Sequence, residues 1–374
     1  MSEAVIVSTA RSPIGRAFKG SLKDERPDDL AAAMVAAALA RIPSFDAADA
    51  TGRGLDDLYL GCAEPSGEAG SNMARVVTIL AGLDNVPGAT INRFCASSLQ
   101  TLRMAFHAIK AGEGHAFVAA GVEAVSRYRD WAGAGETDAS THNPLFDAAR
   151  QRTAARAGSN TPWTDPRLGG RMPDIYIAMG QTAENVATSF GISRADQDAW
   201  AVLSQNRAEA AAASGFYARE ITPYTRKDGT VISRDDSPRT GVTLESVSAL
   251  QPVFRAGGTV TAGNACPLND GAAAVVVMSD VRARELGLEP LARIVSTGVS
   301  ALSPELMGMG PVEASRRALE LAGLGIQDID LVELNEAFAV QVVASARELG
   351  IDHDKLNVHG GAIALGHPIG ATGT

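Results

Sequence analysis

Strand-like and helix-like segments alternate in two separate parts of this chain, and this alternation limits the folds that it can adopt. The expected strands are 4–9, 58–61, 89–92, 116–121, 272–278, 292–299 and 331–334. The expected helices are 28–41, 72–81, 96–110, 311–322 and 337–349. The pattern predicts an α/β fold with a mostly parallel sheet covered by helices, in which the second half repeats the first.

The alternation of strand-like and helix-like segments stops between the two parts, and the composition changes. Residues 127–174 are irregular and rich in Gly, Pro and Trp, and an amphipathic stretch follows at 179–213. A long insertion within an α/β core is usually functional. We therefore expect three parts: an N-terminal core half at 1–121 that is completed by 250–275, an inserted loop domain at 122–249, and a C-terminal core half at 276–374.

Charge and composition exclude several classes of protein. A formal net charge of −10 argues against a general nucleic-acid binder. No apolar run is long enough to span a bilayer, and the first strand starts so close to Met1 that we expect no signal or transit peptide. Cys62, Cys95 and Cys266 show neither disulfide nor metal-ligand spacing. We expect a cytoplasmic protein without a metal and without a membrane partner.

A local basic patch is compatible with this acidic chain. It leaves two interpretations open: a site for an anionic small molecule, or a solvated loop in which neighbouring carboxylates balance the charge. The basic residues are Arg226, Lys227, Arg234 and Arg239, and the neighbouring acids are Asp235 and Asp236.

Cys95 lies between an expected strand and an expected helix. Unpaired N–H groups and the helix dipole favour an anion at a helix N-terminus, so this placement predicts a thiol with a lowered pKa. Such a thiol is a candidate nucleophile. The alternative is a small buried hydrophobic residue.

The same strand-to-helix corner recurs in the second half at Asn335 and Glu336. In open α/β sheets ligands bind at the carboxyl ends of the strands, so the two corners are expected to face one site. Three long motifs gather the candidate residues: NRFCASSLQ (92–100), ELNEAFA (333–339) and HGGAIALGHPIGATG (359–373). Supporting motifs are ARSPIG (10–15), MGQTAE (179–184), GTVTAGN (258–264) and NDG (269–271).

In these motifs and their order the chain resembles the thiolase family from end to end. The resemblance implies two repeated βαβαβαββ halves in α-β-α-β-α layers, with an inserted loop domain that holds coenzyme A. It also implies an enzyme that cleaves a 3-ketoacyl-CoA into acetyl-CoA and a shortened acyl-CoA, or that condenses acetyl-CoA in reverse. The resemblance implies no permanently bound cofactor. It also implies a homodimer or a homotetramer.

The resemblance assigns roles to the residues of the corners. Cys95 is implied as the nucleophile that accepts the acyl group, and His367 as the base that takes its proton. A water held by Asn335, together with His367, is implied to stabilise the enolate oxygen. The Cys95 N–H is implied to stabilise a second oxyanion, on the carbonyl that Cys95 attacks. Glu336 is expected to orient that water or His367. For Asn335, helix capping remains a second interpretation.

The coenzyme A contacts also follow from the resemblance. Arg239 matches an arginine at the nucleotide end, where a planar guanidinium suits adenine or phosphate. For Met179 and Phe338, core packing remains the alternative. The expected binding residues are Arg239, Met179, Ala262, Ala265, Cys266, Ala337 and Phe338.

Several positions depart from the family pattern. Cys266 stands where many relatives carry Ser, and Ala178 and Ser98 favour 3-ketoacyl-CoA breakdown over acetoacetyl-CoA synthesis. Thiolases use a second cysteine in a later Cys-x-Gly turn, so we expect that the working protein continues past Thr374. The alternatives are a non-catalytic acyl-CoA- or lipid-binding relative and a related condensing enzyme.

Overall fold

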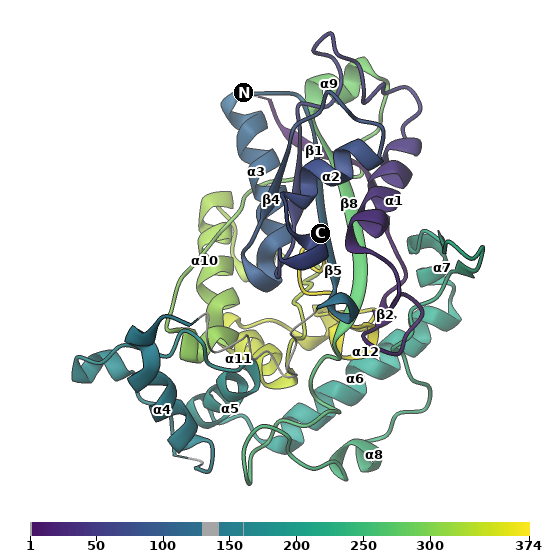
Figure 1. Ribbon diagram of the computed structural model, residues 1–374. Helices are drawn as coiled ribbons and strands as arrows, with labels where there is room; N and C mark the ends of the chain where they lie inside the picture. The colour runs from purple at the N-terminus through teal and green to yellow at the C-terminus, as the bar shows by residue number, and fades with distance from the viewer. Residues whose placement is uncertain (1, 129–141, 160) are drawn as a thin grey trace.

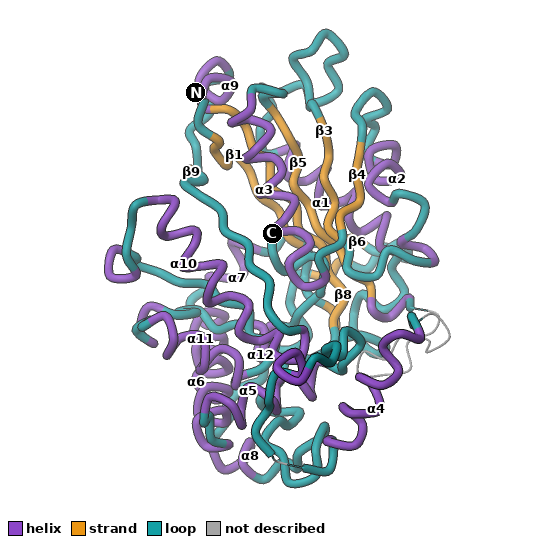
Figure 2. Tube along the Cα trace, turned by 90° about the vertical axis from the view of Figure 1, so that its left-hand side faces the viewer, coloured by secondary structure: helices purple, strands orange, loops and turns teal. Residues whose placement is uncertain are grey.

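The computed structural model describes residues 2–128, 142–159 and 161–374, and a seven-stranded sheet lies at its centre (Figures 1 and 2). The expected irregular stretch 127–174 includes residues 129–141 and 160, which lie outside the described residues. The strand order is β4-β3-β5-β8-β1-β9, and β2 pairs with β8. The bounds are β1 Ala4–Arg11, β2 Gly15–Arg16, β3 Asp57–Gly61, β4 Gly88–Ile91, β5 Ala116–Ala124, β8 Asn269–Ser279 and β9 Ala292–Arg293.

Most strands of this sheet point the same way. Strand β3 is parallel to β4 and β5, while β8 is antiparallel to both β5 and β1. Strands β4, β3, β5 and β1 therefore share one direction, and β8 and β9 oppose it. The expectation of a mostly parallel α/β sheet is confirmed in this sense. Strand β8 lies between two neighbours and is buried along almost its whole length, which explains its nearly continuous run of Ala and Val.

Helices cover both faces of the sheet. Side chains of α1 (Pro27–Ala40) and α2 (Met73–Leu80) share one core with Val118 and Ala120 of β5. Side chains of α3 (Ser97–Ala111) share another with Phe117 and Ala119 of the same strand. This alternation follows from the two-residue period of a strand. The three helices lie close to their expected bounds.

A third core lies below the sheet in Figure 1. It joins α5 (Met179–Phe190) and α6 (Arg194–Ala213) to α10 (Gly310–Ala322) and α11 (Ala339–Leu349). The remaining helices and strands are α4 Asp147–Arg156, α7 Phe216–Glu220, α8 Leu244–Ser248, α9 Asp280–Glu285, α12 Ala362–Leu365, β6 Tyr224–Thr225 and β7 Val231–Ile232. No helix of the described residues is long and apolar enough to cross a membrane.

Two expected strands are wrong in their extent. Of 292–299, only Ala292–Arg293 pairs with β1. Residues 331–334 form a single bridge, from Val332 to Leu356, because the Asn357 side chain takes the place of a backbone ladder there. Its Oδ1 accepts the Leu334 N–H at 2.8 Å and its Nδ2 donates to the Leu334 carbonyl at 2.8 Å. The division into three parts stays a prediction.

We expect Leu60→Ala to lower the free energy of unfolding by about 2–5 kcal/mol, since Leu60 is fully buried in β3 and truncation would leave a cavity. Leu291→Ala is the matched control because the Leu291 side chain is 65% exposed. Urea unfolding followed by circular dichroism measures both. Equal losses in the two variants would contradict this position of β3 in the core.

Candidate functional site

Cys95 lies on a tight turn between β4 and α3. The Phe94 N–H donates to Asn92 Oδ1 at 2.9 Å, and the Ser97 hydroxyl donates to the Phe94 carbonyl at 2.6 Å. Ser97 Oγ also accepts the Arg93 N–H at 2.8 Å. Phe94 has a φ of 46°, which is rare for a bulky side chain and shows that the turn is held against its local preference. The residues on both sides of Cys95, from Asn92 to Ser97, therefore fix where its backbone lies.

The environment of Cys95 acts on its pKa in the direction opposite to the expected one. Burial, with a smaller contribution from the Glu123 carboxylate, raises the pKa of the Cys95 thiol to about 11. The α-helix begins only at Ser97, after a 3-10 turn at Phe94–Ala96, so Cys95 is not in the first turn of α3. Desolvation outweighs any helix-terminal effect. Cys95 is therefore a thiol at neutral pH and needs a base.

His367 is 5% exposed and has a neutral ring at neutral pH. Burial lowers the pKa of His367 to about 4. Its Nδ1 lies 2.7 Å from the Thr372 hydroxyl oxygen, and that hydroxyl donates its proton to the Pro368 carbonyl at 2.9 Å. Thr372 Oγ1 can therefore only accept from His367, which places the ring proton on Nδ1. Nε2 therefore carries no proton of its own, and its lone pair is an acceptor.

Asn335 lies beside this lone pair. Its Nδ2 is 3.3 Å from His367 Nε2, while its Oδ1 is buried and has no hydrogen-bond partner among the described residues. The helix that follows begins at Ala339 with Phe338 as its N-cap, so Asn335 does not cap it. The capping interpretation is wrong, and the Asn335 Nδ2 lies at His367 rather than at the helix backbone.

Glu336 is fully buried and accepts hydrogen bonds from the segments around the corner that carries Asn335. Its carboxylate accepts from Trp200 Nε1 at 3.0 Å, Ser204 Oγ at 2.6 Å, Asn357 Nδ2 at 2.9 Å and the Ile363 N–H at 3.1 Å. His367 is not among these partners. Two donors come from α6 and two from segments that follow the corner in the chain, so we expect Glu336 to hold these segments together rather than to orient His367.

A short extended segment joins Asn335 to His367. Ala265 bridges Phe338, the Cys266 N–H donates to the Ala337 carbonyl at 3.1 Å, and Leu268 bridges His367. The Cys266 thiol lies close enough to Cys95 for the two to interact electrostatically, and burial raises the pKa of Cys266. The structure thus brings the expected residues Ala265, Cys266, Ala337 and Phe338 together with the catalytic candidates Cys95, Asn335 and His367.

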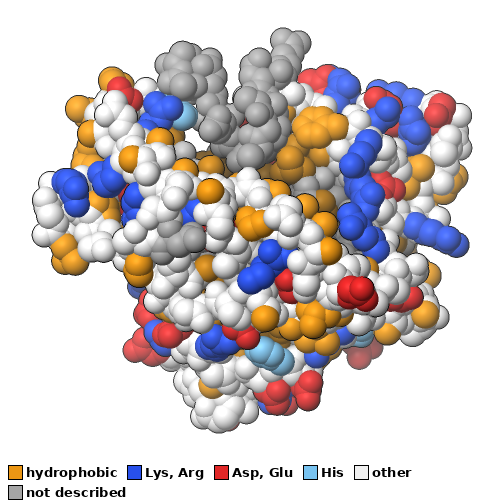
Figure 3. Space-filling view, turned by 90° about the horizontal axis from the view of Figure 1, so that it is seen from below, with side chains coloured by type: hydrophobic (Ala, Val, Ile, Leu, Met, Phe, Trp, Pro, Cys, Tyr) orange, Lys and Arg blue, Asp and Glu red, His pale blue; other side chains and the backbone are white. Residues whose placement is uncertain are grey.

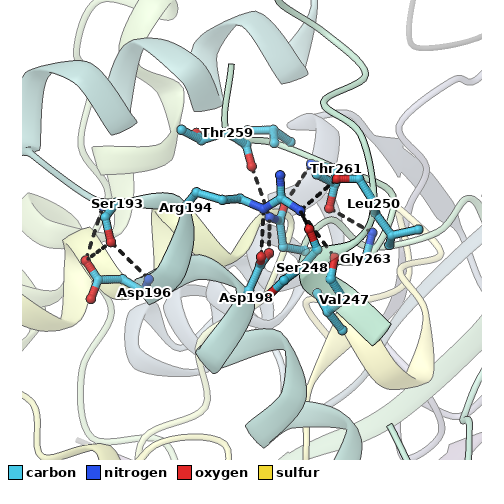
Figure 4. A network of polar contacts seen from close by, with 12 residues as sticks. Ser193, Arg194, Asp196, Asp198, Val247, Ser248, Leu250, Thr259, Thr261 and Gly263 are labelled. Atoms are coloured by element: carbon cyan, nitrogen blue, oxygen red, sulfur yellow. Dashed lines mark hydrogen bonds and ion pairs between the residues drawn. The ribbon is translucent and has the colours of Figure 1, made fainter. Parts of the chain in front are cut away.

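Polar contacts at the start of α6 support the segment that carries Ala262 (Figure 4). The Arg194 guanidinium pairs with Asp198 at 2.7 Å, and Asp198 accepts from Asn264 Nδ2 at 2.9 Å. Asn264 Oδ1 accepts the Thr261 N–H at 2.8 Å. Ala262 itself is exposed, as a lining residue of a binding site must be.

The basic patch divides into two parts. Arg226 pairs with Glu25 at 3.2 Å, and Lys227 pairs with Asp29 at 2.7 Å. The guanidiniums of Arg234 and Arg239 make no ion pair or hydrogen bond within the part of the chain that the structure describes.

The two acids beside the patch do not balance it. Asp235 pairs with Arg11 at 2.9 Å, and Asp236 accepts the backbone N–H groups of Arg16 and Ser21. The interpretation in which these acids are the counter-charges is therefore wrong. Lys and Arg side chains also lie beside exposed hydrophobic ones on the face shown in Figure 3.

The remaining expected binding residues differ in exposure. Met179 is the first residue of α5 and 37% exposed. Phe338 is 8% exposed and packs edge-on against Phe254, with ring centroids 6.1 Å apart. Core packing therefore describes the Phe338 side chain, whereas the Met179 side chain is free for a ligand.

Sequence reasoning missed three residues of this site. Thr372 lies inside a quoted motif, and its spacing of five residues from His367 was the available signal. Asn357 and Glu123 gave no local signal, because their partners lie far away along the chain. Among the described residues, no group of three or more metal-ligating side chains is present.

Comparison with known proteins places this geometry in context. Residues 4–281 match the thiolase N-terminal domain, and residues 288–374 match the thiolase C-terminal domain. The whole chain aligns with 90% of the 3-ketoacyl-CoA thiolase of Bacillus subtilis (strain 168), with 43% sequence identity. It also aligns with 90% of the acetyl-CoA acetyltransferase of Escherichia coli (strain K12), with 42% identity. It also aligns over its full length with 88% of the dimeric peroxisomal thiolase structure of Saccharomyces cerevisiae, with a TM-score of 0.86 and 35% identity.

We expect Thr372→Val to slow the alkylation of Cys95 by iodoacetamide at pH 8 by about tenfold or more, because the base would lose its fixed tautomer. The valine removes the acceptor for the Nδ1 proton at nearly constant volume. Thr372→Ser keeps the hydroxyl and should alkylate at the wild-type rate. A normal rate in the valine variant would refute the proton assignment on His367.

Burial of His367 also predicts a pH dependence of stability. The pKa of about 4 in the folded protein lies below the ordinary value of about 6.5, so the unfolded chain binds the proton more tightly. Stability is lost as pH falls from about 6.5 towards 4, and by pH 5 the loss from this group is about 2 kcal/mol. His367→Asn should remove this component, measured as the difference between the two unfolding curves at pH 7 and pH 5. Parallel pH dependences would argue against a buried neutral His367.

Proposed function

Because the chain belongs to the thiolase family and is an acyl-CoA thiolase, we propose that Cys95 is the thiol that accepts the acyl group and that His367 removes its proton. The observation that supports this most strongly is that the site holds both a protonated Cys95 thiol and a neutral His367 whose Nε2 carries no proton. A nucleophile that is neutral at rest needs such a base.

The cleavage reaction follows from these groups. Cys95 Sγ attacks the 3-keto carbon of a 3-ketoacyl-CoA, and its proton passes to His367 Nε2. The bond between carbons 2 and 3 then breaks, which leaves the shortened acyl group on Cys95 as a thioester and releases the enolate of acetyl-CoA. Transfer of the proton that His367 took from Cys95 to the enolate carbon gives acetyl-CoA and restores neutral His367. Attack by the thiol of coenzyme A on the Cys95 thioester releases the shortened acyl-CoA and restores the Cys95 thiol.

The enolate oxygen needs donors that are already in place. Asn335 lies 3.3 Å from His367 Nε2, so the Asn335 amide, through a water, and the protonated His367 can donate to one oxygen. The Cys95 N–H is proposed as the donor to the oxygen of the carbonyl that Cys95 attacks. Glu336 serves by holding the Asn335 corner in place.

Coenzyme A is proposed to enter between the inserted helices and the segment 262–266. The free guanidinium of Arg239 suits the nucleotide end, and the exposed Met179 and Ala262 suit the pantetheine arm. Small residues at 262, 265 and 337 let that arm pass close to the backbone. No permanently bound cofactor takes part in this proposal.

Substrate choice and assembly are finer proposals. Ala178 and Ser98 favour the breakdown of 3-ketoacyl-CoA, as in β-oxidation, over the synthesis of acetoacetyl-CoA. A homodimer is proposed because the similar yeast structure is described as dimeric. The compartment stays a prediction.

Acetylation of Cys95 tests the proposal. Incubation with acetyl-CoA should add the mass of one acetyl group to the intact protein, and Cys95→Ser should abolish the adduct. Cys266→Ser is the matched control, because this second thiol lies beside Cys95 and is assigned no covalent role. An adduct that survives in the Cys95 variant, or no adduct in the wild type, would contradict the assignment of Cys95.

A further inference from the structure

Glu123 is a buried carboxylate that the reaction scheme does not use. It stands at the end of β5 and is 1% exposed. Its Oε2 accepts the Ala63 N–H at 2.7 Å and the Gly370 N–H at 2.8 Å. The Cys62 thiol and the Tyr128 phenol also bond to this carboxylate. Backbone N–H groups can only donate, so the carboxylate is bound as an acceptor.

The two backbone donors to Glu123 Oε2 belong to different parts of the site. Ala63 follows β3, and Gly370 belongs to the turn that follows His367. The turn is wedged tightly, because a Cβ on Gly370 would lie 2.6 Å from the Val122 carbonyl oxygen and 2.7 Å from Glu123 Oε2. The Glu123 carboxylate therefore links the His367 turn to the end of β5, in addition to the hydrogen bond from the His367 N–H to Asn269 Oδ1 of β8 at 2.9 Å.

The start of α3, the helix that follows Cys95, packs on the same strand ends. A Cβ on Gly61 of β3 would lie 2.5 Å from the Ser98 N, and a Cβ on Gly121 of β5 would lie 2.5 Å from the Ser98 Cβ. Helix α3 thus packs on β3 and β5 without space for a side chain. Because Glu123 belongs to β5, one rigid strand end locates both the Cys95 turn and the His367 turn.

We propose that Glu123 is a positioning residue that sets the separation of Cys95 and His367, by holding the Gly370 turn to the strand ends on which α3 rests. This assignment rests on the proposed function of Cys95 and His367. Glu123 touches neither the substrate nor the reacting atoms, and it acts through the Gly370 N–H.

The charge of Glu123 gives the assignment a distinctive signature. Burial is the main cause of the raised pKa of Cys95, and the Glu123 carboxylate adds a smaller contribution. Burial also raises the pKa of Glu123 itself, while its hydrogen-bond donors favour the charged form. Replacement of the carboxylate by an amide should therefore lower the pKa of Cys95. Loss of position should slow acyl transfer at the same time. A variant with a more acidic thiol and slower acylation is not what general destabilisation would produce.

The experiment compares the acylation of Cys95 by acetyl-CoA in wild-type protein and in Glu123→Gln. The first-order rate at saturating acetyl-CoA should fall about tenfold or more, while the half-saturating concentration changes by less than about threefold. The pH profile of Cys95 alkylation by iodoacetamide should shift to lower pH. Asp56→Asn is the matched control, because Asp56 accepts the His115 and Ala116 N–H groups at the opposite end of the same strand.

Gly370→Ala keeps the carboxylate and tests the same contact from the other side. Its added Cβ should displace the turn and lower the acylation rate without shifting the alkylation profile to lower pH. Wild-type acylation in a folded Glu123→Gln or Gly370→Ala variant, or an equal loss in Asp56→Asn, would overturn the assignment of Glu123. A wild-type protein that forms no acetyl adduct would instead overturn the proposed function itself.

Discussion

Desolvation of Cys95 and His367 is the constraint on which the rest of the site depends. Burial raises the pKa of the thiol and lowers that of the imidazole, so both groups are neutral near pH 7. A neutral pair transfers a proton only when the nitrogen that faces the thiol is unprotonated and correctly placed. The fold must therefore control which nitrogen of His367 carries the proton and how far His367 lies from Cys95. The polar contacts of Thr372 and Glu123 act on these two quantities.

Buried polar side chains control both the proton on His367 and the positions of the segments that carry the site. Thr372 fixes the proton on His367 Nδ1, and Glu336 and Asn357 hold the corner that carries Asn335. These groups lie on segments far apart in the sequence. A buried carboxylate that binds several backbone N–H groups joins such segments in a defined geometry, because each lost hydrogen bond would leave a buried donor unsatisfied.

The sequence predicted the covering helices, the α/β sheet and the motifs that converge at the site. Periodicity and the β-α alternation carry that information locally, as in α3 and β5. It did not predict the antiparallel course of β8, because an apolar strand carries no mark of its direction. It also predicted 331–334 as a strand, since nothing local shows that the Asn357 side chain replaces a ladder there. The raised pKa of Cys95 was missed for the same reason: burial depends on segments that are remote in the sequence.

The central claim is that His367 is a neutral base with its proton on Nδ1 and an unprotonated Nε2 that accepts the proton of Cys95. Two-bond 15N–1H correlation spectra of the wild-type protein, labelled with 15N in the histidine rings and assigned with His367→Asn, measure this state directly at pH 7. We expect the Nδ1–H tautomer, with Nε2 at the shift of an unprotonated nitrogen. An imidazolium, or a proton on Nε2, would contradict the account.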